Sequence, residues 1–90
     1  MRAIDRIRRC VREERYRISL HANEEISEDR LLAVDIEAAI LTGEIRRRFT
    51  SDPRGVRYEI VGTATDSREV GIVCRFLPSE TLLIIAAYEL

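Results

Sequence analysis

Ninety residues, of which 46% are apolar and 34% charged, indicate one small globular domain rather than a disordered chain. The formal net charge of −1 gives no overall basic field for nucleic acid, and no apolar run is long enough to span a membrane. The N-terminus lacks the apolar stretch of a signal peptide, so we expect a cytoplasmic protein with no membrane partner. All fifteen basic residues are arginine, whose planar group suits bidentate contacts with carboxylates or phosphates.

Charge is unevenly distributed along the chain. Residues 1–17 contain seven arginines and three acids, whereas residues 21–44 contain one arginine and seven acids. Residues 3–15 place apolar side chains at helical spacing among the arginines, which predicts an amphipathic helix. Two interpretations of this helix remain open. It packs on the domain with a solvated charged face, which we favour, or its basic surface binds RNA or an acidic partner.

The next segments predict a short strand and two helices. Residues 16–20 predict the strand, and residues 21–32 predict a helix. Four acids would line the outside of that helix: Glu24, Glu25, Glu28 and Asp29. Asp35 is a good N-cap for a second helix over residues 36–42, and Gly43 stands where a C-terminal cap belongs.

The C-terminal half, from Gly43 to Leu90, predicts four antiparallel strands in series. Turns at residues 51–55, 65–67 and 78–80 separate them. The last run, residues 81–88, is apolar on both sides, as expected of an interior strand. We therefore expect a single α+β domain over residues 1–90, with N-terminal helices packed on one face of a four- to five-stranded antiparallel sheet.

Strict alternation assigns side chains to the two faces of this sheet. The apolar face would carry Ile45, Phe49, Tyr58, Ile60, Ile72, Cys74, Phe76, Ile84 and Tyr88. We expect the helices over residues 21–32 and 36–42 to cover it, and Cys74 to be a buried thiol. The second face would carry Arg46, Arg48, Arg57, Arg75 and Glu59 beside Val61, Val73, Leu83 and Ile85. The helix over residues 3–15, or a second copy of the chain, would cover its apolar part.

Several short motifs resemble domain-of-unknown-function family 4258. They are the strand before His21-Ala22, Val34-Asp35-Ile36-Glu37, Gly43-Glu44-Ile45 and Tyr58-Glu59-Ile60-Val61-Gly62. The resemblance covers residues 16–90 and leaves the helix within residues 1–15 outside. That family is similar to the BrnT, MqsR and RelE/ParE group of small bacterial toxins, which pack helices on an antiparallel sheet.

The resemblance implies a toxin-like component of a bacterial type II toxin–antitoxin system with an antitoxin protein as partner. In the ribonuclease branch, basic and aromatic side chains on the open sheet face cut RNA without metal, so we expect no cofactor. This chain departs from that branch because its net charge is slightly negative. It also has no lysine and one histidine, which limits its general acids and bases.

If the resemblance carries function, Arg57 and Arg75 would stabilise the phosphate during cleavage. Glu59 would orient the reactants or remove a proton, and His21 or a hydroxyl would supply one. The RNA-binding residues would be Arg46, Arg48 and Arg54. The alternatives are that Glu59 and its arginines form only cross-strand ion pairs, and that His21 makes a structural hydrogen bond.

Two functions of different classes remain open. The first is the metal-independent endoribonuclease, inhibited by an antitoxin. The second is a non-catalytic interaction module that forms a homodimer or binds a protein through the same sheet face. A metal site is not expected, because one histidine and two distant cysteines give no ligand spacing.

Overall fold

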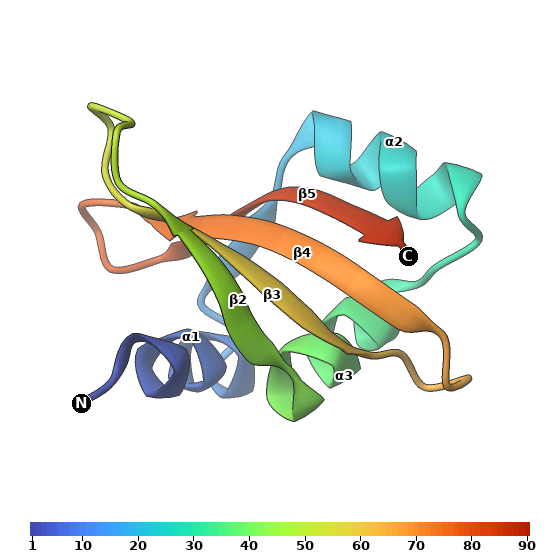
Figure 1. Cartoon of the computed structure of the whole chain (residues 1–90). Helices are drawn as coiled ribbons and strands as arrows, with labels where there is room; N and C mark the ends of the chain where they lie inside the picture. Colours follow the sequence, from blue (N-terminus) through green and yellow to red (C-terminus); the bar gives the residue numbers. More distant parts are fainter.

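The computed structural model describes all residues from 1 to 90 and confirms the α+β class. Its elements are α1 (Ala3–Arg12), β1 (Tyr16–Ile18), α2 (Leu20–Glu28), α3 (Ala33–Thr42), β2 (Glu44–Phe49), β3 (Arg57–Thr63), β4 (Glu69–Phe76) and β5 (Leu82–Glu89) (Figure 1). Their order is the predicted one, and most boundaries shift by only a few residues. None of the three helices is both long enough and apolar enough to cross a membrane.

The five strands form one sheet in the order β1-β5-β4-β3-β2. The last four strands pair antiparallel as predicted, whereas β1 pairs parallel with β5. The sheet is therefore mixed, and the prediction of a purely antiparallel sheet is wrong. β1 has three residues and no hairpin joins it to β5, so no tight turn imposes an antiparallel direction. β5 lies between β1 and β4, which confirms that the last strand is interior.

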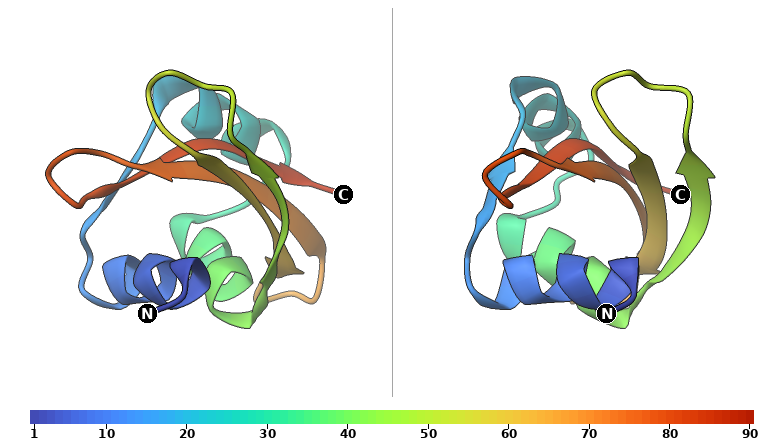
Figure 2. Two further views of the ribbon diagram at one scale, coloured as in Figure 1. Left: turned by 60° about the vertical axis from the view of Figure 1, so that its left-hand side comes forward. Right: turned by 90° about the vertical axis from the view of Figure 1, so that its left-hand side faces the viewer.

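One side of the sheet forms the hydrophobic core with α1 and α3. Ile60, Ile72 and Ile84 are fully buried there, and Cys74 is buried beside them, as alternation predicted. Figures 1 and 2 show α1 and α3 on this side of the sheet and α2 at its edge, against β5. The prediction that α2 and α3 cover the core face is correct for α3 and holds only in part for α2, which adds Ala22 and Ile26 to the same core from beside β5. The apolar stripe of α1 covers the part of the face that was assigned to α2.

α2 closes the edge of β5 beyond the end of β1. The Glu25 carboxylate accepts a hydrogen bond from the backbone N–H of Ala87 at 3.1 Å, and the Asp29 carboxylate accepts one from Glu89 at 2.8 Å. Sequence analysis predicted that both acids would lie on the solvent-facing side of the helix. They instead satisfy N–H groups that an edge strand would leave unpaired.

A buried carboxylate fixes the start of α3. The helix begins at Ala33 rather than at residue 36, so Asp35 lies inside its first turn and is not the N-cap. Asp35 accepts hydrogen bonds from the backbone N–H groups of Leu32 (2.8 Å) and Thr65 (3.1 Å). The Thr65 hydroxyl also donates to Asp35 and is the main cause of its lowered pKa. One side chain thereby joins α3 to the turn between β3 and β4.

Two glycines let α3 approach β3 closely. A Cβ on Gly62 would lie 1.8 Å from the carbonyl oxygen of Ala39, which no real contact allows. Gly43 is the C-cap of α3, as predicted, with an extended backbone (φ −90°, ψ 177°). A Cβ there would lie 2.5 Å from the same oxygen. Both positions therefore require the absence of a side chain.

Two β-bulges reverse the predicted faces of particular residues. In β2, Ile45 pairs with Ile60 but Arg47 pairs with Glu59, so Arg46 is an extra residue in the strand. In β5, Ile85 is the extra residue between the partners of Val73 and Cys74 on β4. An inserted residue shifts the alternation of every side chain beyond it.

Three assignments from alternation are therefore wrong. Arg48 pairs with Tyr58 and lies on the core side of the sheet edge, whereas Phe49 pairs with Arg57 on the other side. Tyr88 pairs with Gly71 and also lies opposite the core face. The open face, as we call the side opposite α1 and α3, carries Arg17, Glu44, Arg47, Phe49, Arg57, Glu59, Val61, Thr63, Glu69, Gly71, Val73, Arg75, Leu83, Ala86 and Tyr88.

Candidate functional site

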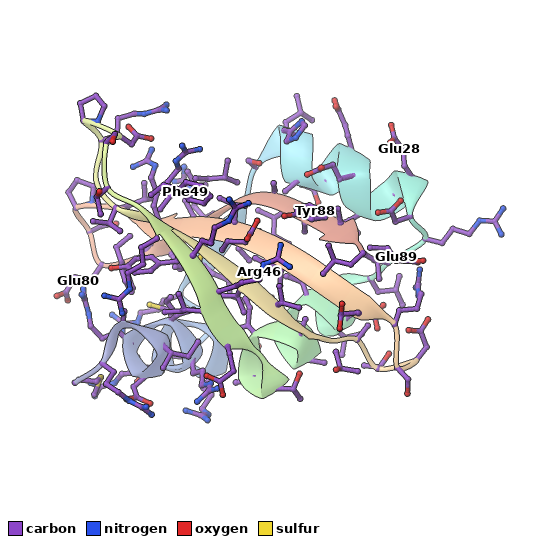
Figure 3. All side chains as sticks on the ribbon, in the orientation of Figure 1. Glu28, Arg46, Phe49, Glu80, Tyr88 and Glu89 are labelled. Atoms are coloured by element: carbon purple, nitrogen blue, oxygen red, sulfur yellow. The ribbon has the colours of Figure 1, made fainter.

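Glu59 is the centre of the polar cluster on the open face. Its residue is only 5% exposed, although its neighbours are arginines that extend into solvent. Oε1 accepts hydrogen bonds from Nε of Arg46 at 3.0 Å and from Nε of Arg47 at 3.3 Å. Oε2 accepts one from the Tyr88 hydroxyl at 3.1 Å. Arg46 comes from β2, next to β3, and Tyr88 comes from β5, which lies beyond β4 on the other side; Figure 3 shows these two side chains on the same face of the sheet.

The environment of Glu59 keeps it ionised. The hydrogen bond from Arg46 is the largest cause of its lowered pKa, and those from Arg47 and Tyr88 act in the same direction against desolvation. A carboxylate with a lowered pKa and three donors is a weak proton acceptor. Glu59 is thus better suited to hold Arg46, Arg47 and Tyr88 in place than to act as a general base.

Tyr88 belongs to this cluster because of the bulge in β5. Its ring lies over Gly71, where a Cβ would approach the ring carbons to 2.6 Å. Partial burial, followed by the nearby Glu59 charge, raises the pKa of Tyr88 above its ordinary value. The hydroxyl therefore stays protonated at neutral pH and remains a hydrogen-bond donor. Sequence reasoning assigned this tyrosine a role in the core.

Phe49 is a second aromatic side chain beside the cluster. The guanidinium carbons of Arg57 and Arg47 lie 5.1 Å and 5.5 Å from its ring centroid, within the range of cation–π contacts. The bulge at Arg46 places Phe49 here, beside the arginines and partly exposed, instead of in the core. Arg48 makes its cation–π contact with Tyr58 at 5.7 Å and is separated from the cluster.

The turn between β2 and β3 contributes a second carboxylate. Asp52 accepts two side-chain hydrogen bonds from Arg54, at 3.1 Å and 3.2 Å, and these bonds are the main cause of its lowered pKa. Nε of Arg57 lies 3.4 Å from Asp52 but is buried and donates no hydrogen bond. Arg54 is therefore occupied by Asp52, while the guanidinium of Arg57 keeps unused donors.

Arg57 and Arg75 are direct partners in the register of β3 and β4. Both are partly buried, and Arg75 makes no side-chain hydrogen bond or ion pair. This part of the surface holds five arginines (Arg46, Arg47, Arg54, Arg57 and Arg75) and two acids (Glu59 and Asp52), so it carries a charge of +3 on a chain of net charge −1. The positive charge is local rather than global.

His21 does not join the cluster. It lies in the first turn of α2 with its side chain 67% exposed, and its one polar partner is Glu25, at 3.3 Å from Nε2. Of the proposed catalytic residues, the structure brings together Arg57, Glu59 and Arg75. Of the proposed RNA-binding residues, Arg46 lies in the cluster, Arg54 lies beside it, and Arg48 faces away.

The two cysteines are free and buried. Cys74 is a buried thiol of the core, as predicted, and burial raises its pKa to about 12. Cys10 lies on the buried side of α1, and its thiol is 3.4 Å from the carbonyl oxygen of Glu80. No three histidine, cysteine, aspartate or glutamate side chains converge in a way that could hold a metal ion.

Comparison with known proteins identifies the family of the chain. The model of a domain of unknown function, DUF4258, matches residues 18–89, which include the last residue of β1, the strands β2 to β5 and the Glu59 cluster. No curated protein and no solved structure matches the chain. The helix α1 precedes the matched region, as the motifs predicted. Because the match covers most of its length, the protein belongs to the DUF4258 family.

Proposed function

We propose that the chain is the toxin-like component of a bacterial type II toxin–antitoxin system and that it cleaves RNA without metal on its open face. The observation that carries this proposal is the pairing of Arg57 with Arg75. Like charges directly opposite each other in a sheet are destabilising, so an anion bound between them would relieve the repulsion. A phosphodiester is such an anion, and guanidinium groups bind it through several hydrogen bonds.

In the proposed reaction, the 2′-oxygen attacks the adjacent phosphorus and the bond from phosphorus to the 5′-oxygen breaks. The products are a 2′,3′-cyclic phosphate and a free 5′-hydroxyl. The 2′-proton passes to water and the 5′-oxygen takes one from water, which reaches this exposed face. Arg57 and Arg75 stabilise the charge that accumulates on the phosphate, the largest contribution in most such sites.

Glu59 and Tyr88 position other side chains of the proposed site through hydrogen bonds. Glu59 holds Arg46 and Arg47 over the face, so both arginines can contact phosphates next to the scissile one. Tyr88 keeps its proton and fixes the second oxygen of Glu59. His21 has no role in this mechanism, because its only polar contact is on α2.

The test is RNA cleavage by the purified chain in the presence of a metal chelator. Arg57→Ala and Arg75→Ala should each lower the cleavage rate by about a hundredfold to a thousandfold, the usual effect of losing one preorganised donor. Arg12→Ala is the matched control, since Arg12 is exposed on α1 and makes no side-chain hydrogen bond. Equal rates for all four proteins would reject the proposed site.

A second function is favoured by the apolar part of the open face. Val61, Val73 and Leu83 are partly exposed there, and α1 does not cover them because it packs on the core side. A non-catalytic module could use this surface to form a homodimer or to bind a protein. A chain that cleaves no RNA, arrests no bacterial growth on expression and forms a dimer by light scattering would support this function instead.

A further inference from the structure

We propose that the open face binds RNA as a single strand along one row of residues that crosses all five strands of the sheet. The row consists of Phe49, Arg57, Arg75, Leu83 and Arg17. This inference rests on the proposed function, since it specifies the form of RNA and its path over the same face. Phe49, Leu83 and Arg17 extend the site beyond the residues that surround the scissile phosphate.

The pairing of the strands defines the row. Phe49 on β2 pairs with Arg57 on β3, which pairs with Arg75 on β4, which pairs with Leu83 on β5. Leu83 is also the partner of Arg17 on β1. Direct partners lie on the same face of a sheet, so all five side chains point to the open face. Four strand spacings of about 4.8 Å give the row a length of about 19 Å.

The side chains of the row suit a polynucleotide. Three of the five are arginines. Arg17 and Arg75 make no ion pair, and Arg57 makes one with Asp52 at 3.4 Å without donating a hydrogen bond from Nε. Arg17 is exposed and makes no side-chain hydrogen bond or ion pair. Phe49 and Leu83 place an apolar side chain on either side of the pair Arg57–Arg75. Cations for phosphates next to apolar surfaces for bases are the usual components of single-strand binding sites.

The opposite end of the open face does not suit RNA. There α2 lies along β5, with the carboxylates of Glu25 and Asp29 bound to the backbone of Ala87 and Glu89. These acids, together with the exposed Glu44 at the start of β2, give that end a negative charge. A polyanion is therefore repelled from the α2 end and attracted to the row, where β1 pairs with β5.

Phe49 favours a single strand over a duplex. Its ring can stack on a base only when that base is not already stacked inside a helix. The major groove of an RNA duplex is too deep and narrow for side chains, and its shallow minor groove presents no base face. A duplex on this row would contact the arginines but would leave Phe49 and Leu83 without partners.

The test measures binding by fluorescence anisotropy with RNA of about ten nucleotides, within the usual site sizes of single-strand binders. Its 2′-hydroxyls carry methyl groups, so the proposed cleavage is blocked and binding is measured alone. Phe49→Ala should weaken binding by about fivefold to 150-fold, and Phe49→Tyr should retain it. Arg17→Ala should lower the slope of log K against log salt by about 0.7, while the control Arg12→Ala leaves the slope unchanged.

Each result of these binding measurements either supports or overturns the proposed row. Weaker binding of a duplex of the same sequence, together with the effects of Phe49→Ala and Arg17→Ala, would support the row. Binding that is unchanged in both variants, or as strong for the duplex, would overturn the row and leave the proposed ribonuclease standing. The absence of any RNA binding by the wild type would overturn both. Thermal unfolding of each variant shows whether a loss of binding comes from a loss of fold.

Discussion

Arg57 lies directly opposite Arg75 across β3 and β4, and Arg75 has no carboxylate partner. The same sheet pairs its other central arginines with an acid, since Arg46 and Arg47 both donate to Glu59. The contrast separates two kinds of arginine on one face. Those at Glu59 are held by hydrogen bonds to a carboxylate, whereas Arg57 has only the longer ion pair with Asp52 at 3.4 Å and Arg75 has no acidic partner.

Neutralising one arginine of this pair should stabilise the fold. Arg75→Gln removes the repulsion between direct neighbours and keeps part of the side-chain stem, so we expect the free energy of unfolding to rise by about 0.2–1 kcal/mol. Arg75→Lys keeps the charge and should show no such gain. Urea denaturation at low salt measures the difference. A loss of stability in Arg75→Gln relative to Arg75→Lys would show that the pair is not strained.

Glu59 and Tyr88 should be energetically coupled. Tyr88→Phe removes one hydrogen bond to a charged group, which costs about 1.5–3 kcal/mol. In a Glu59→Gln background the same change should cost less, because the acceptor has lost its charge. The difference, measured by a double-mutant cycle in urea, should be at least about 0.5 kcal/mol. Additive effects would mean that the bond contributes nothing to stability.

The stabilisation by Glu59 should depend on pH. Its pKa is lower in the folded state, mainly because of the hydrogen bond from Arg46, so the contribution is complete above the ordinary pKa of a glutamate. It is lost as the pH falls through the folded-state pKa. The stability difference between wild type and Glu59→Gln should therefore shrink as the pH is lowered from about 6 to about 3. A constant difference over that range would contradict the assigned cause.

Gly62→Ala should be strongly destabilising. The added methyl would overlap the carbonyl oxygen of Ala39, so α3 must move away from β3, at a cost of about 3 kcal/mol or more. Gly55→Ala is a useful contrast, because Gly55 has open space around it and only a positive φ of 122° to oppose a side chain. The larger loss of stability should occur at Gly62. Equal losses would show that α3 adapts without strain.

The sequence predicted those parts of the fold that depend on residues close together in the chain. Regular alternation in β3 and β4 identified the core face, and turn residues marked the three hairpin connections correctly. The parallel pairing of β1 with β5 could not be read in this way. Its register depends on contacts between segments more than sixty residues apart, such as Tyr16 with Leu82.

The errors in the site come from the two bulges. Alternation has a period of two, so one extra residue, Arg46 in β2 or Ile85 in β5, reverses the faces of the residues that follow. Phe49 and Tyr88 were assigned to the core for this reason. In a regular strand, Arg47 would face the side opposite Arg46 and Arg48, so at least one of the three would point toward the core. This run of arginines was therefore the one signal in the sequence that the strand is irregular.

The most direct test of the account is a comparison of single-turnover cleavage rates without metal. We predict that Arg57→Ala and Arg75→Ala are each slowed by about a hundredfold or more, and that the double variant is slowed little further, because the two guanidinium groups act on one phosphate. Far-ultraviolet circular dichroism must show that all three keep the wild-type fold. Cleavage by the folded double variant at the wild-type rate would contradict the central claim.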